Sequence, residues 1–222
     1  MATLTFAESV PVNIFIEKHS LSIRIWHWTT YLALTASLIT VLLGSTLFKT
    51  RDNVAMVQEE LQQKGASITK DQAWAVAHEY SDKLWDTHKI IGYVICFLLL
   101  SRMIIEIAQP SEEKLKIKIR NALRFRSKNP EGLNEQRHFL FVKRVYLIFY
   151  VAILTMAITG LGLAFEDAPY LKDIQKPIKG VHSFVQYFIY SFILFHIIGV
   201  IRAETGRYKG IVSGMIHKKN KN

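Results

Sequence analysis

Two histidines in one long apolar stretch, His182 and His196, have the spacing that most clearly suggests chemistry. Their separation of fourteen residues, at about 100° per residue, falls about 40° short of four full helical turns. Both imidazoles are therefore expected on nearly the same face of a helix, about 21 Å apart along its axis. A histidine inside a membrane span is energetically unfavourable and by default functional. Because imidazole is a common metal ligand, the spacing indicates two stacked metal centres, one near each side of a membrane.

Four stretches of the chain have the length and composition of membrane spans. The chain is 50% hydrophobic yet has 28 Lys+Arg, and apolar spans joined by charged loops account for both figures. We expect an all-α fold, an integral membrane four-helix bundle of up-down-up-down topology that forms a single domain over residues 1–222. Its spans are expected at about 23–48, 87–108, 140–165 and 181–202, with an outer, periplasmic loop at about 49–84.

The distribution of basic residues sets the expected orientation. With four spans, both termini share one side with the loop from about Gln109 to Arg137, which is rich in lysine and arginine. On the opposite side, the loop Lys49–Lys83 has five basic residues against six acidic ones. By the positive-inside rule, both termini are expected in the cytoplasm.

Two segments outside the spans have helical patterns. Lys114–Arg126 interleaves basic and apolar residues and is expected to lie on anionic lipid headgroups. Nucleic-acid binding is not expected, because the chain lacks a basic soluble domain. The long outer loop is expected to be helical around Val54–Gln63 and Asp71–Leu84. A docking role and an idle amphipathic cap both stay open for this loop.

Chain direction pairs the four histidines at membrane depth. His27 begins the first span and is expected near the cytoplasmic side, level with His196 near the end of the fourth span. His88 begins the second span and is expected near the outer side, level with His182. Two bis-histidine sites result, His27 with His196 and His88 with His182. Two imidazoles on facing helices can hold a b-type haem and leave no axial position open for oxygen, which favours electron transfer.

The residues also limit which cofactors the chain could hold. The single cysteine, Cys96, excludes covalent c-type haem and an iron–sulfur cluster held by this chain alone. Zinc is disfavoured because it needs three or four ligands grouped tightly. From the pattern alone, the histidines could still be interhelical hydrogen-bonding groups. His138 is a rival ligand, while His19, His78 and His217 are expected to be solvated.

Basic residues at the cytoplasmic span ends are candidates to bind the anionic haem propionates. Arg24 is the first candidate, because it lies three residues before His27 and on a neighbouring part of the same helix surface. The alternative is a purely topological role. Small residues near the histidines could let a flat macrocycle approach a helix, or could simply let spans pack. These are Gly92, Gly160, Gly162 and Gly199.

Several motifs are similar to those of a known family. They are RIWHW around His27, DTHKIIGY around His88, the fourth-span pattern GVHSFVQYFIYSFILFH, and the tail GRYKGIVSGMIHKKN. With them the chain resembles the bacterial four-helix dihaem cytochromes b. This family includes cytochrome b561 and the cytochrome b subunits of nickel–iron hydrogenases and formate dehydrogenases. The resemblance extends from about His19 to His217.

The resemblance implies two haem b groups that relay electrons across the bacterial inner membrane. The electrons would pass between a periplasmic redox partner, such as a dehydrogenase or hydrogenase subunit, and the quinone pool, with quinone as the electron acceptor. The chain would work within a complex or as a homo-oligomer. Whether it is an enzyme in its own right or an electron-transfer subunit of a quinone-linked oxidoreductase stays open.

Two other functions stay open beside this one. The chain could be a stand-alone oxidoreductase that passes electrons from a small donor such as superoxide to quinone, or a haem-free transporter or scaffold with four spans. Steering of a small anion needs positive potential. Because the outer loops are neutral to acidic, they favour a protein donor over superoxide.

Overall fold

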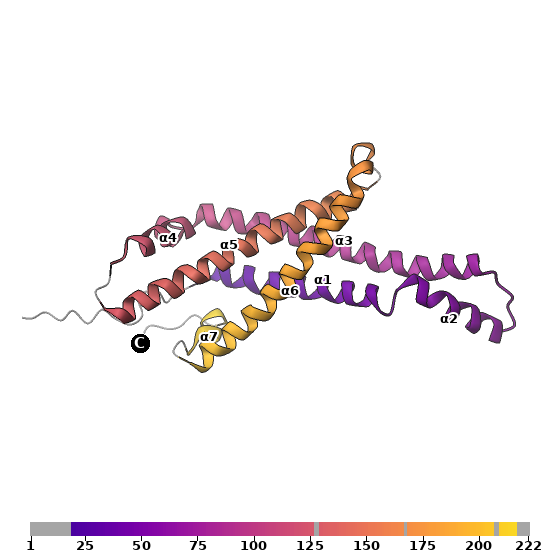
Figure 1. Ribbon diagram of the computed structural model, residues 1–222, viewed down its shortest axis with the longest axis horizontal. Coiled ribbons are helices and arrows are strands. Elements are labelled where there is room, and N and C mark those ends of the chain that lie inside the picture. Colours follow the sequence, from indigo (N-terminus) through magenta and orange to yellow (C-terminus); the bar gives the residue numbers. More distant parts are fainter. Residues whose placement is uncertain (1–18, 127–128, 167, 207–208, 217–222) are drawn as a thin grey trace, which may run out of the picture. The chain divides into compact units, whose positions relative to one another are not determined.

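The computed structural model describes residues 19–126, 129–166, 168–206 and 209–216, and the elements formed by these residues are helices (Figure 1). The α-helices are α1 Leu21–Ser45, α2 Thr50–Gln63, α3 Lys70–Ala108, α4 Leu115–Arg124, α5 Pro130–Ala164, α6 Gln175–Thr205 and α7 Ile211–Ile216. Two short 3-10 helices, η1 Ser111–Glu113 and η2 Pro169–Ile174, precede α4 and α6. The prediction of an all-α protein is confirmed. His217 and the first eighteen residues lie outside the described residues.

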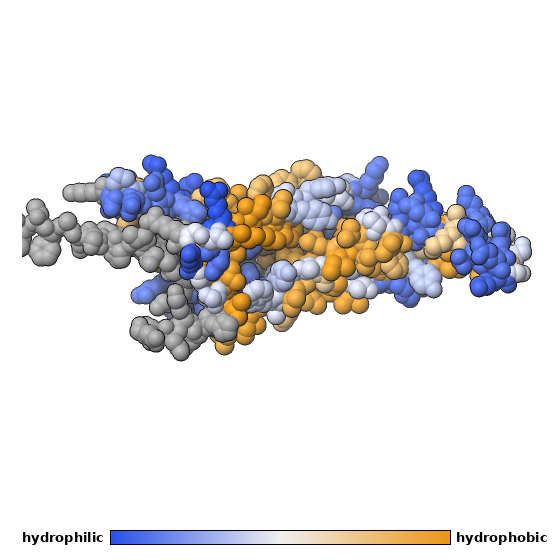
Figure 2. Space-filling model, turned by 90° about the horizontal axis from the view of Figure 1, so that it is seen from below, coloured by the Kyte–Doolittle hydropathy of each residue, from blue (hydrophilic) through white to orange (hydrophobic). Residues whose placement is uncertain are grey.

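Four helices are long and apolar enough to cross a membrane, as predicted: α1, α3, α5, and α6 together with η2. At 1.5 Å per residue, the 25 residues of α1 reach about 37 Å, which exceeds the roughly 30 Å of a bilayer's hydrocarbon core. Large apolar side chains are exposed along all four, among them Leu32, Phe97, Leu147 and Phe195. Figure 2 shows such side chains over long stretches of the surface, as expected where the neighbour is lipid.

The segment between the first two spans is helical, as predicted, but α3 is longer than expected. A single helix runs from Lys70 through the second span to Ala108. No proline or glycine occurs between Lys70 and Ile91 to interrupt it. A reciprocal capping box starts α3: the Gln72 backbone N–H donates to the Thr69 hydroxyl (3.2 Å), and the Thr69 N–H donates to the Gln72 amide oxygen (2.8 Å).

A small core joins α2 to the start of α3. Val54, Ala73 and Ala77 are buried there, with Ala73 fully inaccessible to solvent, and Val57 and Ile68 pack against them. Alanines at this spacing lie on one face of α3 and let the two helices approach closely. The chain reverses direction at residue 65, a glycine with φ of 82°, a backbone conformation that favours glycine at the end of a helix.

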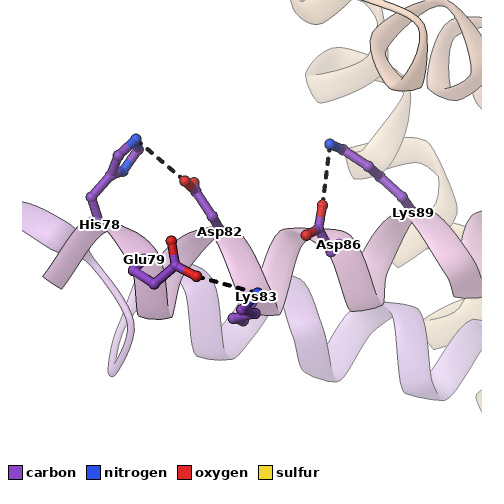
Figure 3. Close-up of polar contacts among 6 residues, drawn as sticks. All are labelled: His78, Glu79, Asp82, Lys83, Asp86 and Lys89. Atoms are coloured by element: carbon purple, nitrogen blue, oxygen red, sulfur yellow. Dashed lines mark hydrogen bonds and ion pairs between the residues drawn. The ribbon is translucent and has the colours of Figure 1, made fainter. Parts of the chain in front are cut away.

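The outer part of α3 presents paired charges to solvent (Figure 3). The pairs, each within one helical turn, are His78 with Asp82, Glu79 with Lys83, and Asp86 with Lys89. Exposed pairs of this kind contribute little to stability. The Glu79–Lys83 and Asp86–Lys89 pairs each bring opposite charges together, so they add no net charge to this surface.

The chain divides into two compact units, and the four long helices contribute residues to both. The first unit comprises residues 1–24, 103–153 and 187–222, and the second comprises residues 25–102 and 154–186. His27, His88 and His182 belong to the second unit, and His196 belongs to the first.

Side-chain hydrogen bonds hold the second unit together at two points. The indole N–H of Trp26, in the RIWHW motif, donates to the backbone carbonyl of Leu98 (2.7 Å) and so ties α1 to α3. The Gln175 amide donates to the Gly162 carbonyl (3.0 Å) and ties the start of α6 to α5. These bonds help to set the positions of the helices that bear histidines in this unit.

The first unit has similar ties at its short helices. The Gln136 amide donates to the Ala122 carbonyl (2.6 Å) and joins α4 to α5. The Glu204 carboxylate accepts backbone N–H bonds from Gly210 and Val212 (both 3.0 Å), which holds the start of α7 beside the end of α6. Polar side chains therefore satisfy backbone groups that a short helix leaves unpaired.

Replacing Ala73 by leucine is expected to loosen α2 from α3. The fully buried site has no space for the added atoms, and overpacking of this kind destabilises by about 1–3 kcal/mol. Hydrogen exchange of the α2 and α3 amides in the detergent-solubilised protein measures the change. Ala75→Leu, at an exposed position on the same helix, is the control and should exchange like the wild type. Equal effects of the two changes would contradict the packing described.

Candidate functional site

The second unit brings His88 of α3 near His182 of α6. The two imidazoles are close enough to interact electrostatically, and both rings are partly buried. The edge of the Trp85 indole lies against the His88 ring, with centroids 5.5 Å apart. Two histidines predicted to lie at one depth are thus near neighbours. Their joint ligation of a metal stays a prediction.

Each of these two histidines has a threonine hydroxyl at Nδ1. Thr40 Oγ1 of α1 lies 2.8 Å from Nδ1 of His88, and Thr159 Oγ1 of α5 lies 2.9 Å from Nδ1 of His182. All four long helices therefore contribute one side chain to this arrangement. With Nδ1 engaged, Nε2 is the ring nitrogen left to bind a metal, and ligating histidines usually have such a partner on the other nitrogen. The residues present fit a bis-histidine haem b.

Neither threonine was predicted from the sequence as part of the site. Thr40 is 48 residues from its histidine and Thr159 is 23 residues from its own, so no local motif links the pairs. The available signal was a hydroxyl residue inside an apolar span. That signal is weak, because threonine in a span often bonds only to the preceding helical turn.

The other two predicted ligands belong to different units. His196, in the first unit, stacks on Phe192 with centroids 5.7 Å apart and ring planes 7° apart. Phe192 in turn stacks on Phe149 of α5 at 4.0 Å. His27, in the second unit, lies edge-on to Trp28 at 5.4 Å. The pairing of His27 with His196 stays a prediction from chain direction.

Among the glycines singled out from the sequence, Gly160 has the clearest structural reason. A Cβ at this position would lie 3.3 Å from Cε1 of His182, closer than an ordinary contact, so glycine makes room for the imidazole itself. Gly162 similarly accommodates Ile178. No described atom lies within 4 Å of a Cβ built at Gly92 or Gly199. Helix packing thus explains Gly162, whereas open space borders the other two.

Arg24, the predicted propionate partner, is buried in the first unit, with 9% of its surface exposed. Its Nη1 donates to the Ile216 carbonyl (3.2 Å) at the end of α7. Its Nε is buried without a hydrogen-bond partner among the described residues. A buried N–H donor with this unused capacity fits an anionic oxygen such as that of a propionate.

The remaining histidines of the described chain are placed less favourably for ligation. His78 lies at the surface, where it stacks on Trp74 and faces Asp82. In the described residues, no three or more histidine, cysteine or carboxylate side chains come together in a group that could hold a metal ion. A centre that takes two protein ligands, with a macrocycle supplying the rest, suits the paired histidines better than zinc does.

Four helices that are long and apolar enough to cross a membrane, and that bear histidines, are features of a multi-pass membrane cytochrome. The family model described as prokaryotic cytochrome b561 matches residues 18–218, and the chain belongs to this family. Membership implies a dihaem cytochrome of the bacterial inner membrane, with b-type haems and electron transfer across the membrane as its function. No curated protein and no solved structure matches the chain.

Replacing Gly160 by alanine is expected to displace the His182 ring, because the new methyl group would approach Cε1 to 3.3 Å. The affinity for haem at this histidine should fall about tenfold, because changes to the surroundings of a metal ligand lower metal affinity by about tenfold or more. Haem content per chain, from the absorption of the extracted haem, measures it. The matched control is Gly180→Ala on α6, where the added Cβ meets no described atom within 4 Å. Full haem content in Gly160→Ala would contradict this role.

Proposed function

We propose that this protein transfers electrons across the bacterial inner membrane between a periplasmic redox partner and the quinone pool. The observation that carries the proposal is the pair of histidines in the second unit, each held at Nδ1 by a threonine from a neighbouring span. Such a pair suits two axial ligands of one haem. The chain would form one membrane cytochrome b domain over residues 1–222.

In this proposal, His88 and His182 bind the outer haem through Nε2, and His27 and His196 bind the inner one. A bound haem b supplies a one-electron iron couple. The protein orients the ring nitrogens, keeps both axial positions filled, and surrounds the site with apolar side chains that exclude water. The separation of about 21 Å between His182 and His196 along one helix suits two stages of transfer across the membrane.

Arg24 is proposed to bind a propionate of the inner haem. Its burial, its bond to the Ile216 carbonyl and its unused Nε support this role. The carbonyl bond holds the guanidinium in place, so that the Nε–H keeps one orientation. A charge-assisted bond from an arginine fixed in this way is stronger than one between neutral groups.

The proposed orientation has both termini in the cytoplasm, with spans running up, down, up and down. The basic residues between the second and third spans support it. In this orientation α2 and the first part of α3 lie in the periplasm, where a donor would dock. The balanced charge pairs on α3 favour a redox protein over a small anionic donor. The chain would then be the electron-transfer subunit of a quinone-linked oxidoreductase.

The haem assignment is tested by spectra of the purified protein and two variants. Dithionite should produce a b-type spectrum with about two haems per chain in the wild type. His196→Ala should lose the inner haem and keep the outer one, whereas His182→Ala should do the reverse, because each change removes one axial ligand. Gly160→Ala identifies the outer haem in these spectra. It should lower the content of the same haem that His182→Ala loses, and it should leave the other haem unchanged. A colourless preparation from haem-replete cells would exclude the proposal.

A steady-state assay separates the electron-transfer subunit from a stand-alone oxidoreductase. The isolated chain, reconstituted with quinone, should not oxidise superoxide faster than a haem-depleted sample does. Substantial quinone reduction by superoxide would favour the stand-alone function. Co-purification of a periplasmic redox protein would support the subunit.

A further inference from the structure

We propose that Thr40 and Thr159 are positioning residues that fix the tautomer and ring orientation of His88 and His182, and so tune the outer haem. This inference rests on the proposed function, since it concerns the ligands assigned there. The two threonines come from α1 and α5, and the two histidines come from α3 and α6. All four residues belong to the second unit.

The direction of the hydrogen bond at Thr40 follows from counting protons. Its hydroxyl has one hydrogen and two lone pairs. Oγ1 lies 2.7 Å from the backbone carbonyl of Ser37, and a carbonyl can only accept, so the hydroxyl hydrogen is donated there. Toward His88, at 2.8 Å, the same oxygen can then only accept. Nδ1 of His88 must therefore carry the proton, and its Nε2 has the free lone pair that a metal requires.

The same count applies at Thr159. Its Oγ1 lies 2.7 Å from the Thr155 carbonyl oxygen and 3.3 Å from the Met156 carbonyl oxygen. The hydroxyl hydrogen is therefore donated to the preceding helical turn here as well. Nδ1 of His182, 2.9 Å from Oγ1, is left as the donor. Both histidines thus have the tautomer that ligates through Nε2. The site is preorganised, and binding need not select a minor tautomer.

Burial makes the Thr40 hydroxyl difficult to replace by water. Thr40 is 5% exposed, and the surroundings are apolar spans. Removing the hydroxyl would take away the oxygen that lies 2.8 Å from Nδ1 of His88, and with it the hydrogen bond that this oxygen accepts. The ring would then lose both its orientation and the electron density that an Nδ1–H bond lends to Nε2. A neutral acceptor lends less density than a carboxylate would, so these threonines set a moderate ligand strength.

Another threonine, Thr87, shows that a hydroxyl residue beside a histidine need not bond to its ring. Thr87, next to His88 on α3, is exposed and donates to the Lys83 carbonyl (3.0 Å). Among the described residues, the Thr87 hydroxyl has this bond to the Lys83 carbonyl as its hydrogen bond. Thr87 therefore serves as a control: it is adjacent to a ligand, but it bonds only to its own helix.

The first experiment is a potentiometric titration of the full-length, haem-loaded protein, followed by visible absorption. Thr40→Val and Thr159→Val should each stabilise the ferrous outer haem, because a less electron-rich Nε2 supports ferric iron less well. The ratio of reduced to oxidised outer haem at a fixed ambient potential should rise about threefold to tenfold. A tenfold change is 59 mV for a one-electron couple. The inner haem should titrate as in the wild type.

Two further variants separate this role from a merely structural one. Thr40→Ser keeps the hydroxyl and should restore both the potential and the low-spin electron paramagnetic resonance signal of the outer haem. Thr87→Val should leave both unchanged. If Thr40→Val and Thr159→Val match Thr87→Val in potential and signal, the inference is wrong.

The second experiment does not depend on bound haem. Nitrogen-15 spectra of histidine-labelled protein prepared without haem should show Nδ1 protonated in His88 and His182. In Thr40→Val, the His88 signals should shift toward a mixture of tautomers. Protonation at Nε2 in the wild type would overturn the inference. If Thr40→Val and Thr159→Val each bind two haems with wild-type potentials, only this inference is refuted. If the wild-type protein cannot bind haem, the proposed function is refuted as well.

Discussion

The absence of water in the membrane interior is the constraint on which this structure depends. A backbone N–H or carbonyl without a partner in hydrocarbon costs several kcal/mol, so a spanning segment must be helical. The same constraint acts on side chains, and an imidazole there needs a hydrogen-bond partner supplied by the protein. The threonines at His88 and His182 meet this need in the same way: each hydroxyl oxygen accepts from Nδ1 of the histidine and donates its own hydrogen to a carbonyl of its own helix.

Close helix approach is the second requirement, and small residues provide it where the site needs it. Gly160 admits the His182 ring beside α5, and Ala73 and Ala77 let α2 pack on α3. A polar contact ties another pair of helices, because the Trp26 indole of α1 donates to the Leu98 carbonyl of α3. A histidine can hold a fixed orientation only because its helix neighbours are held at this distance. Helix packing therefore also determines the orientation of the histidine side chains.

Much of the fold could be predicted from local patterns. The four apolar helices and the helical outer segment follow from hydropathy and from the absence of helix breakers. The continuity of α3 from Lys70 to Ala108 was not predicted, because the change from a charged to an apolar composition near Asp86 suggested a boundary. The helix continues through this change in composition, because the residues on both sides of it have similar helix propensities.

The sequence by itself determined which helices form, which of them are apolar enough to cross a membrane, and the family to which the chain belongs. All of these depend on composition and on spacing along one helix. Only the tertiary structure decided that Thr40 meets His88, that Thr159 meets His182, and that Gly160 borders an imidazole ring. Contacts between helices depend on their rotation and relative shift, which are set jointly by many side chains on several helices. No single stretch of sequence contains that information.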